Sequence, residues 1–107
     1  SAGAVGAALM TDKGNIYTGI CIIVACGIGF CAEHSAIAEM LKHGEKNIHA
    51  VVAIEEGKVL PPCGRCRELM VNISSYNQQT MVAVSNTTLV QLKELIPHQW
   101  VKYQLTV

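Results

Sequence analysis

His49-Ala50-Val51-Val52-Ala53-Ile54 is a short apolar run of the kind found in a buried central strand. In the segment that precedes this run, apolar residues recur at helical spacing from Cys31 onward, which predicts a helix. Gly44 is the candidate C-cap of this helix. After it, Pro61-Pro62 breaks the chain and starts a second helix. A strand that leaves one helix and leads into another predicts a βαβ unit, and we therefore expect an α/β fold.

The flanking segments complete this expectation. Residues 4–10 and 15–22 surround a polar turn with the composition of a hairpin connection, which predicts two antiparallel strands. Residues 80–85 form a further expected strand. Thr88 and Gln91 have the spacing of a capping box, which predicts a late helix that stops at Pro97, and residues 100–107 are a candidate last strand.

The composition limits the kind of partner. The chain has 107 residues, of which 50% are hydrophobic and 15% charged, with eight basic against eight acidic residues. We therefore expect one domain over residues 1–107, no disorder and no electrostatic binding of nucleic acid. A small-molecule substrate is favoured, and the apolar excess favours an oligomer.

Five cysteines, two of them in Cys-x-x-Cys spacing, indicate metal or redox chemistry in a reducing compartment such as the cytoplasm. We expect no signal peptide and no membrane span, because the apolar stretch from Ile20 to Phe30 is short and is interrupted by Gly27 and Gly29.

Three cysteines and one carboxylate mark a candidate metal site. Cys31 and Glu33 fall at the start of the first helix, and Cys63 and Cys66 fall three residues apart at the start of the second. A structural zinc has four protein ligands, whereas a catalytic zinc keeps one position open. We therefore predict a zinc ion held by three thiolates, with Glu33 carrying a proton between water and substrate.

Three thiolates make the site negative, which opposes the activation of water. The positive ends of the two helix dipoles reduce this charge. Arg65 and Arg67 are candidates to add hydrogen bonds to the thiolates from outside the ligand set.

Other assignments of these residues remain open. Cys63 and Cys66 alone also suit a redox dithiol, and Cys21 or Cys26 could complete a four-cysteine structural site, although a cysteine in an apolar strand is more often a small buried hydrophobe. His34 points away from Glu33 around the helix, which favours packing or a hydrogen bond over ligation. Trp100 is expected in the core or at an interface.

The segments Cys31-Ala32-Glu33 and Pro62-Cys63-Gly64-Arg65-Cys66-Arg67 together resemble the zinc-dependent cytidine deaminase superfamily in its three-cysteine form. The resemblance implies a three-layer α/β/α sandwich around a mixed five-stranded sheet, without the helix that usually precedes the first strand. It also implies a homotetramer with one zinc per chain.

The implied reaction is hydrolytic deamination of the exocyclic amine of a cytosine-type or related aminated heterocycle. Glu33 protonates a ring nitrogen, ammonia leaves, and backbone groups of Ala32 and Pro62 hold the edge of the base.

This chain departs from the family at the second strand. Cys21 and Ile23 stand where cytidine deaminases have Asn and Glu that bind ribose, and His34 replaces a common arginine. Gly27-Ile28-Gly29-Phe30 and the run that starts at Leu60 resemble the blasticidin-S deaminase branch more closely. The departures leave the substrate open. They also keep a second hypothesis in view, a catalytically silent zinc-stabilised binding or assembly module.

Overall fold

The computed structural model describes residues 1–100, which form a six-stranded mixed sheet, two α-helices and three short 3-10 helices. The strand order is β2-β1-β3-β5-β6, and β4 also pairs with β3. In chain order the elements are β1 (Ala2–Thr11), β2 (Ile16–Ile22), η1 (Ala25–Gly27), α1 (Ala32–Lys42), β3 (Ile48–Glu55), β4 (Lys58–Leu60), α2 (Gly64–Ile73), η2 (Ser75–Gln79), β5 (Met81–Ser85), β6 (Thr88–Gln91) and η3 (Leu92–Leu95).

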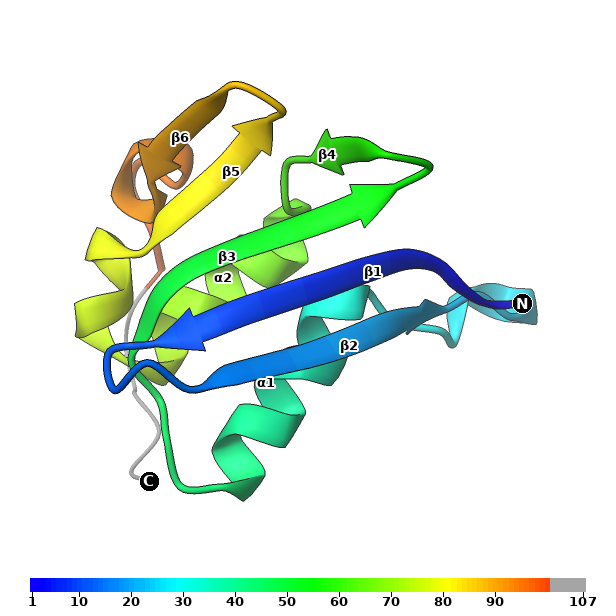
Figure 1. Cartoon of the computed structure of the whole chain (residues 1–107), viewed down its shortest axis with the longest axis horizontal. Coiled ribbons are helices and arrows are strands. Elements are labelled where there is room, and N and C mark those ends of the chain that lie inside the picture. Colours follow the sequence, from blue (N-terminus) through cyan, green and yellow to red (C-terminus); the bar gives the residue numbers. More distant parts are fainter. Residues whose placement is uncertain (101–107) are drawn as a thin grey trace.

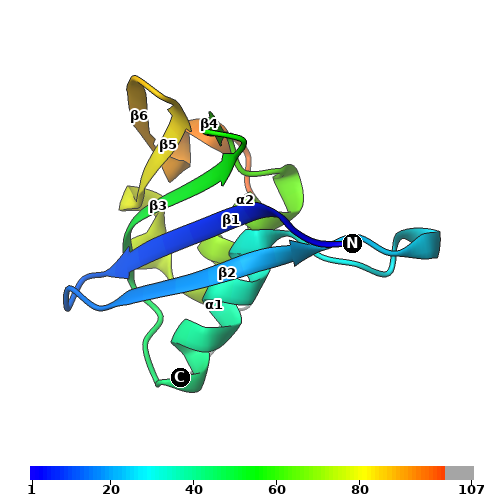
Figure 2. The same ribbon diagram turned by 45° about the vertical axis from the view of Figure 1, so that its right-hand side comes forward.

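Both α-helices cover the same face of the sheet (Figures 1 and 2). The strands β3 and β5 are parallel and α2 connects them, so the predicted βαβ unit and the α/β class are confirmed. Residues 1–100 therefore supply two of the three expected layers. No helix of these residues is long and apolar enough to span a membrane.

The described sheet has six strands, where five were expected, because two strands were missed. One is β4, which is only three residues long. The other is β6, where a helix start at Thr88 was predicted. Thr88 to Gln91 instead pair antiparallel with β5, and the capping box is displaced to Gln91 and Glu94, which begin η3. The predicted last strand, residues 100–107, lies outside the described residues except for Trp100.

The core lies between the sheet and the two helices. Leu9, Val51 and Val82 come from three strands and pack with the helical residues Met40 and Met70, all at most 5% exposed. Each such side chain contributes about 1.5–3 kcal/mol through burial. The cluster fixes both helices against one sheet face, so that the helix starts lie on a rigid support.

Two glycines permit close approaches that position the first helix. A Cβ on Gly19 in β2 would lie 2.5 Å from the backbone nitrogen of Ala36 in α1. A Cβ on Gly29 would lie only 1.9 Å from the carbonyl oxygen of Ile22. Beside Gly29, Phe30 exchanges two backbone hydrogen bonds with Ile22, of 2.9 and 3.0 Å. The loop after β2 is thereby held against the strand and leads directly to Cys31.

A tight hairpin positions the second helix. Glu56 and Gly57 both have positive φ, 49° and 76°, as a two-residue type I′ connection requires. The hairpin pairs β4 with the end of β3, and the Asn86 side chain reinforces it by accepting the Val59 N–H at 2.8 Å. The chain therefore turns back beside β3 and reaches Cys63 at the same end of the sheet as Cys31.

Candidate metal and catalytic site

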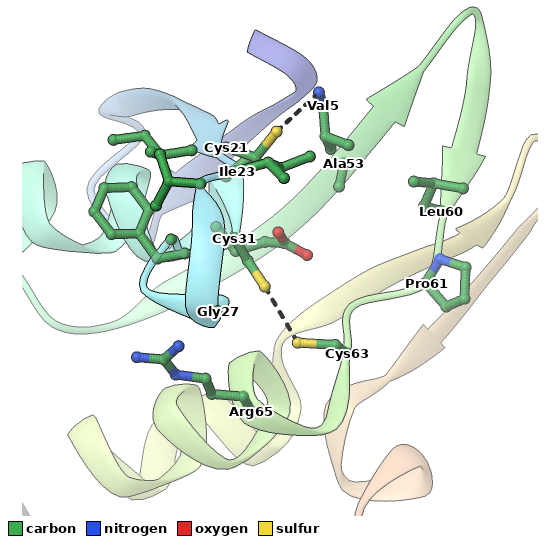
Figure 3. Close-up of a pocket in the computed structure, with 16 residues that line it drawn as sticks. Val5, Cys21, Ile23, Gly27, Cys31, Ala53, Leu60, Pro61, Cys63 and Arg65 are labelled. Atoms are coloured by element: carbon green, nitrogen blue, oxygen red, sulfur yellow. Dashed lines mark hydrogen bonds between the residues drawn. The ribbon is translucent and has the colours of Figure 1, made fainter. Parts of the chain in front are cut away.

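The starts of α1 and α2 meet through their first cysteines. Cys31 and Cys63 are the N-cap residues of the two helices, each with extended backbone dihedrals. Their Sγ atoms lie 3.3 Å apart (Figure 3). The prediction that two helix N-termini converge on one cluster of thiols agrees with this geometry.

Cys66 brings a third sulfur to the cluster. Its Sγ lies 3.6 Å from that of Cys63 and within 4.8 Å of that of Cys31. Two sulfurs bound to one tetrahedral zinc at about 2.3 Å lie about 3.8 Å apart. The measured separations are close to this value, so the three sulfurs have a spacing that suits one zinc ion.

His34 gives the cluster a nitrogen. Its Nδ1 lies 3.3 Å from the Cys66 sulfur, so Cys31, His34 and Cys66 also form a set that could hold one metal ion. The same contact satisfies the hydrogen bond that the sequence favoured for His34. The Cys63 sulfur contacts both other sulfurs, so Cys31, Cys63 and Cys66 form a second candidate set of three ligands.

The environment affects the three thiols differently. Burial raises the pKa of Cys66 well above its usual range, and the charge of Glu33 raises it further. Burial also raises the pKa of Cys31. At Cys63 burial acts in the same direction, but hydrogen bonds from the backbone N–H groups of Cys66 and Arg65 and from the Cys31 and Cys66 thiols together outweigh it and lower the pKa. A cation that binds here must displace protons from the deeper thiols.

A cavity of about 420 Å³ lies against this cluster. Glu33 lines it and is only 5% exposed, so its carboxyl group is held beside the sulfurs and away from bulk water. The other lining residues are mostly apolar: Val5, Cys21, Ile22, Ile23, Val24, Gly27, Gly29, Phe30, Cys31, Ala32, Ala53, Leu60, Pro61, Cys63 and Arg65 (Figure 3).

The predicted substrate contacts fall partly on this cavity. Ala32, Cys21 and Ile23 line it, whereas Pro62 is buried and does not line it, although both of its neighbours do. Cys21 is a buried strand residue whose sulfur accepts the Val5 N–H at 3.3 Å. It therefore behaves as the small buried residue that the sequence favoured, and not as a fourth metal ligand.

The two arginines of the second motif have different surroundings. Arg67 donates through Nε to the Pro62 carbonyl at 2.8 Å and through a terminal nitrogen to the Leu95 carbonyl at 3.1 Å. The hydrogen bonds expected from Arg67 to sulfur are therefore not formed, and Arg67 instead fixes the loop that carries Cys63. Arg65 lines the cavity, and its charge adds to the effect of burial in lowering the pKa of His34.

Sequence reasoning did not identify several other features of the site. Phe30 and Leu60 line the cavity, and their position depends on the Ile22–Phe30 bridge and on β4. The only available signal for Phe30 was its place directly before Cys31. Trp100 is 63% exposed, so it does not lie in the core of this chain, and its other expected place, an interface, stays a prediction.

The fold and the site together define a zinc-binding α/β protein of the hydrolytic deaminase class. A family model described as "Cytidine and deoxycytidylate deaminase zinc-binding region" matches residues 1–83. The chain belongs to this family.

Relatives and solved structures agree with this assignment. Blasticidin-S deaminase from Bacillus cereus is 33% identical over 111 residues, which cover 92% of this chain and 77% of that protein. A cytidine deaminase from Mycobacterium tuberculosis is 36% identical over 70 residues, 64% of this chain, and this match spans about half of that relative (53%).

The fold is shared with solved cytidine deaminases. The crystal structure of the Mycobacterium tuberculosis enzyme has a TM-score of 0.80 at 28% identity and covers 92% of this chain and 78% of that one. The structure from Bacillus anthracis has a TM-score of 0.76 at 29% identity, with 90% and 74% covered.

Proposed function

We propose that this protein is a zinc-dependent hydrolytic deaminase that removes the exocyclic amine of a cytosine-type or related aminated heterocycle. The observation that carries the proposal is the group of three thiols beside a buried carboxylate in one apolar cavity. The names of the relatives, cytidine deaminase and blasticidin-S deaminase, support the same chemistry.

Cys31, Cys63 and Cys66 are the proposed ligands, with His34 in contact with the Cys66 sulfur from outside the ligand set. Zinc in such a site supplies a water that is acidic enough to act as a nucleophile at neutral pH. The N-termini of α1 and α2 stabilise the negative charge of the thiolates. Arg67 holds the Pro62–Cys63 loop in the position that ligation by Cys63 needs.

Glu33 is the proposed proton carrier. Its carboxylate would accept a proton from the attacking water and deliver it to the ring nitrogen of the heterocycle while the water oxygen bonds to the carbon that carries the amine. It would then move the second proton of that water to the amine, so that the C–N bond breaks, ammonia leaves and a carbonyl group remains on the ring. Burial of Glu33 beside the sulfurs keeps it within reach of both partners and excludes competing water. The backbone of Ala32 and the chain at Pro62 are the proposed contacts for the edge of the base.

The apolar wall of the cavity would contact the plane and substituent of the substrate. Cys21 and Ile23 belong to this wall. Small-molecule pockets are typically lined by apolar and aromatic side chains, with a few polar groups that fix the orientation of the ligand. The wall therefore suits a flat heterocycle and does not by itself select one.

Ammonia release from a panel of amines tests the proposal. Cytosine, cytidine, deoxycytidine, blasticidin S and guanine would be incubated with protein reconstituted with zinc and with the chelated protein as the control. We expect zinc-dependent release from at least one of them. Zinc-loaded, folded protein that releases ammonia from no member of the panel would favour a silent binding or assembly module on the same scaffold.

A cytoplasmic homotetramer is the proposed form of the protein. All five cysteines are free thiols, which suits a reducing compartment. Large apolar side chains are exposed on the sheet face opposite the helices and on the loop after β2, among them Ile16, Ile20, Ile23 and Ile28. Light scattering coupled to gel filtration would measure the mass, and a monomer at micromolar concentration would contradict the assembly.

A further inference from the structure

We propose that the cavity holds the ring substituent of its substrate against an apolar wall, so that an aminated heterocycle with an aliphatic substituent is preferred to one with a sugar. This inference rests on the proposed function, since it names the class of substrate that the same cavity takes. It follows from the position of the polar groups of the cavity and from the contacts that already occupy them.

The cavity has room for a ring and a substituent. Its volume of about 420 Å³ lies within the range of small-molecule pockets, about 300–1,000 Å³. Figure 3 shows Val5, Cys21 and Ala53 on the opposite side of Cys31 from Cys63. In a cytosine-type ring the amine and the N1 substituent lie at opposite ends. An amine directed at the thiol cluster therefore directs the substituent away from it.

The side chains of this apolar wall, which are Val5, Cys21, Ile23 and Ala53, offer no hydrogen bond to a sugar. Three are aliphatic, and the Cys21 sulfur already accepts the Val5 N–H at 3.3 Å. Within residues 1–100, no hydroxyl or amide side chain lines the cavity. A sugar hydroxyl that loses water here without gaining a partner weakens binding by about 5- to 150-fold.

The backbone beside the wall is occupied as well. Ile22 and Phe30 exchange two hydrogen bonds, of 3.0 and 2.9 Å. Ile23 donates its N–H to the Ser1 carbonyl at 2.8 Å, and its own carbonyl accepts a hydrogen bond from the Ser1 nitrogen at 2.6 Å. The peptide groups at the end of β2 are thus used within the fold, and carbon atoms face the substituent.

The two charged side chains of the cavity have other positions. Glu33 is buried beside the sulfurs, where it is placed to move the proton. Arg65 belongs to the first turn of α2 and lies on the Cys63 side in Figure 3. Affinity for the substituent therefore depends on apolar contact. Ile23 is 56% exposed, so an aliphatic group against it removes apolar surface from water.

Binding to the zinc-loaded Glu33→Gln protein tests the inference without turnover. Calorimetry would compare 1-methyl-, 1-ethyl- and 1-propylcytosine with 1-(2,3-dihydroxypropyl)cytosine, which adds only two hydroxyls to the propyl compound. We expect the affinity to rise about fourfold for each methylene and to fall at least about tenfold with the two hydroxyls. The heat capacity change of binding should become more negative along the alkyl series.

Adding Ile23→Gln places a polar group on the wall and should reduce the preference for propyl over dihydroxypropyl by at least about fivefold. Ile28→Gln is the matched control, since Ile28 is an exposed isoleucine of the same loop that does not line the cavity. It should keep the preference. An unchanged preference in Ile23→Gln would overturn the placement of the substituent on this wall.

Two results with the Glu33→Gln protein would overturn the inference directly. One is equal affinity for the propyl and dihydroxypropyl compounds, or tighter binding of the latter. The other is an affinity that does not rise from methyl to propyl, which includes the absence of binding by every compound to folded, zinc-loaded protein.

Ammonia release by the natural protein separates this inference from the proposed function. Alkyl-dependent binding without release from any substrate would contradict the deaminase and leave the apolar wall intact. Release from cytidine with a kcat/KM equal to or above that for 1-propylcytosine would contradict the preference alone.

Discussion

The sulfur atoms of Cys31 and Cys63 lie 3.3 Å apart, although 32 residues separate the two cysteines in the chain. The contact depends on the bridge between Ile22 and Phe30 on one side and on the β3–β4 hairpin on the other. A metal bound by both sulfurs would therefore connect α1 to α2 and add its binding free energy to the stability of the fold.

Removal of zinc should lower the thermal stability for this reason. At a free zinc concentration 1,000 times Kd, binding only to the folded state contributes about 4 kcal/mol. For a chain of this size we expect the Tm to fall by more than about 10 °C on chelation. Scanning calorimetry of zinc-loaded and chelated protein under reducing conditions measures the shift, and equal Tm values would contradict a metal at this cluster.

Substitutions should distinguish the residues that bind zinc from those that only contact a zinc ligand. Cys63→Ala removes a proposed ligand and should lower bound zinc from one per chain to well below one. His34→Ala removes only a contact to the Cys66 sulfur and should weaken zinc binding by about 10- to 100-fold, the usual effect of an outer-shell partner.

Cys26→Ser serves as the control for both variants, because Cys26 is exposed and lies outside the cluster. Zinc content by mass spectrometry and zinc affinity by competition with a chelator measure the effects. If His34→Ala loses zinc completely while Cys63→Ala keeps it, the ligand set is Cys31, His34 and Cys66.

Glu33→Gln should retain zinc and fold while losing turnover. The amide has nearly the same shape as the carboxyl group but cannot carry the proton, so we expect kcat to fall by at least about 10³-fold. The exposed Glu39→Gln, on the same helix, is the matched control. Activity of the Glu33→Gln protein within tenfold of the natural chain would exclude Glu33 as the proton carrier.

Local sequence pattern accounts for much of this molecule. Two segments around a polar turn predicted β1 and β2, helical spacing predicted α1, and Pro61-Pro62 predicted the start of α2. The thiol cluster followed from two helix starts, since cysteines at an N-cap or first turn point toward whatever lies ahead of the helix. These features depend on interactions between residues that are close together in the chain, and such interactions can be inferred from a single sequence.

The missed features depend on contacts between distant segments. Thr88-Leu89-Val90-Gln91 has the letters of a capping box and also those of a short strand, and pairing with β5 decides between them. Arg67 was expected at the sulfurs, yet the Leu95 carbonyl, 28 residues away, takes one of its donors. The pattern of neighbouring residues in the sequence does not predict a hydrogen-bond partner that is so far away in the chain.

Tyr17→Phe should change the pH dependence of stability. The Tyr17 hydroxyl donates to Glu45 Oε2 at 2.5 Å, which lowers the pKa of Glu45 below its usual 4.5 and raises the pKa of Tyr17 above 10.0. The pair therefore stabilises the fold between these values. Its contribution is lost as the pH falls through the folded pKa of Glu45, and again as the pH rises above 10.

Urea unfolding from pH 3 to pH 8 measures this effect. We expect the Tyr17→Phe protein to be less stable at pH 7 and to lose less stability on acidification than the natural chain. Tyr76→Phe is the control, since the Tyr76 hydroxyl makes no hydrogen bond within residues 1–100. Parallel stability curves for natural and Tyr17→Phe protein would show that Glu45 does not depend on Tyr17.

Asn77→Ala should be among the most destabilising single changes in the described part of the chain. The Asn77 side chain is fully buried, accepts the Ile48 N–H at 2.7 Å, and donates to the carbonyls of Lys46 and Met70 at 3.0 and 2.9 Å. It thereby joins the start of β3 to the end of α2. Alanine leaves three backbone groups without partners, at about 1–3 kcal/mol each, so we expect a loss of at least about 3 kcal/mol.

Asn72→Ala is the matched control, because Asn72 is half-buried and its amide donates from the surface of α2 to the carbonyls of Glu68 at 2.8 Å and Trp100 at 3.3 Å. Its loss should cost about 1 kcal/mol. Urea unfolding of zinc-loaded protein compares the two variants, with unchanged m-values showing that the unfolded states are alike. A difference below about 1 kcal/mol would mean that water replaces the Asn77 amide, and that the β3–α2 junction does not depend on this side chain.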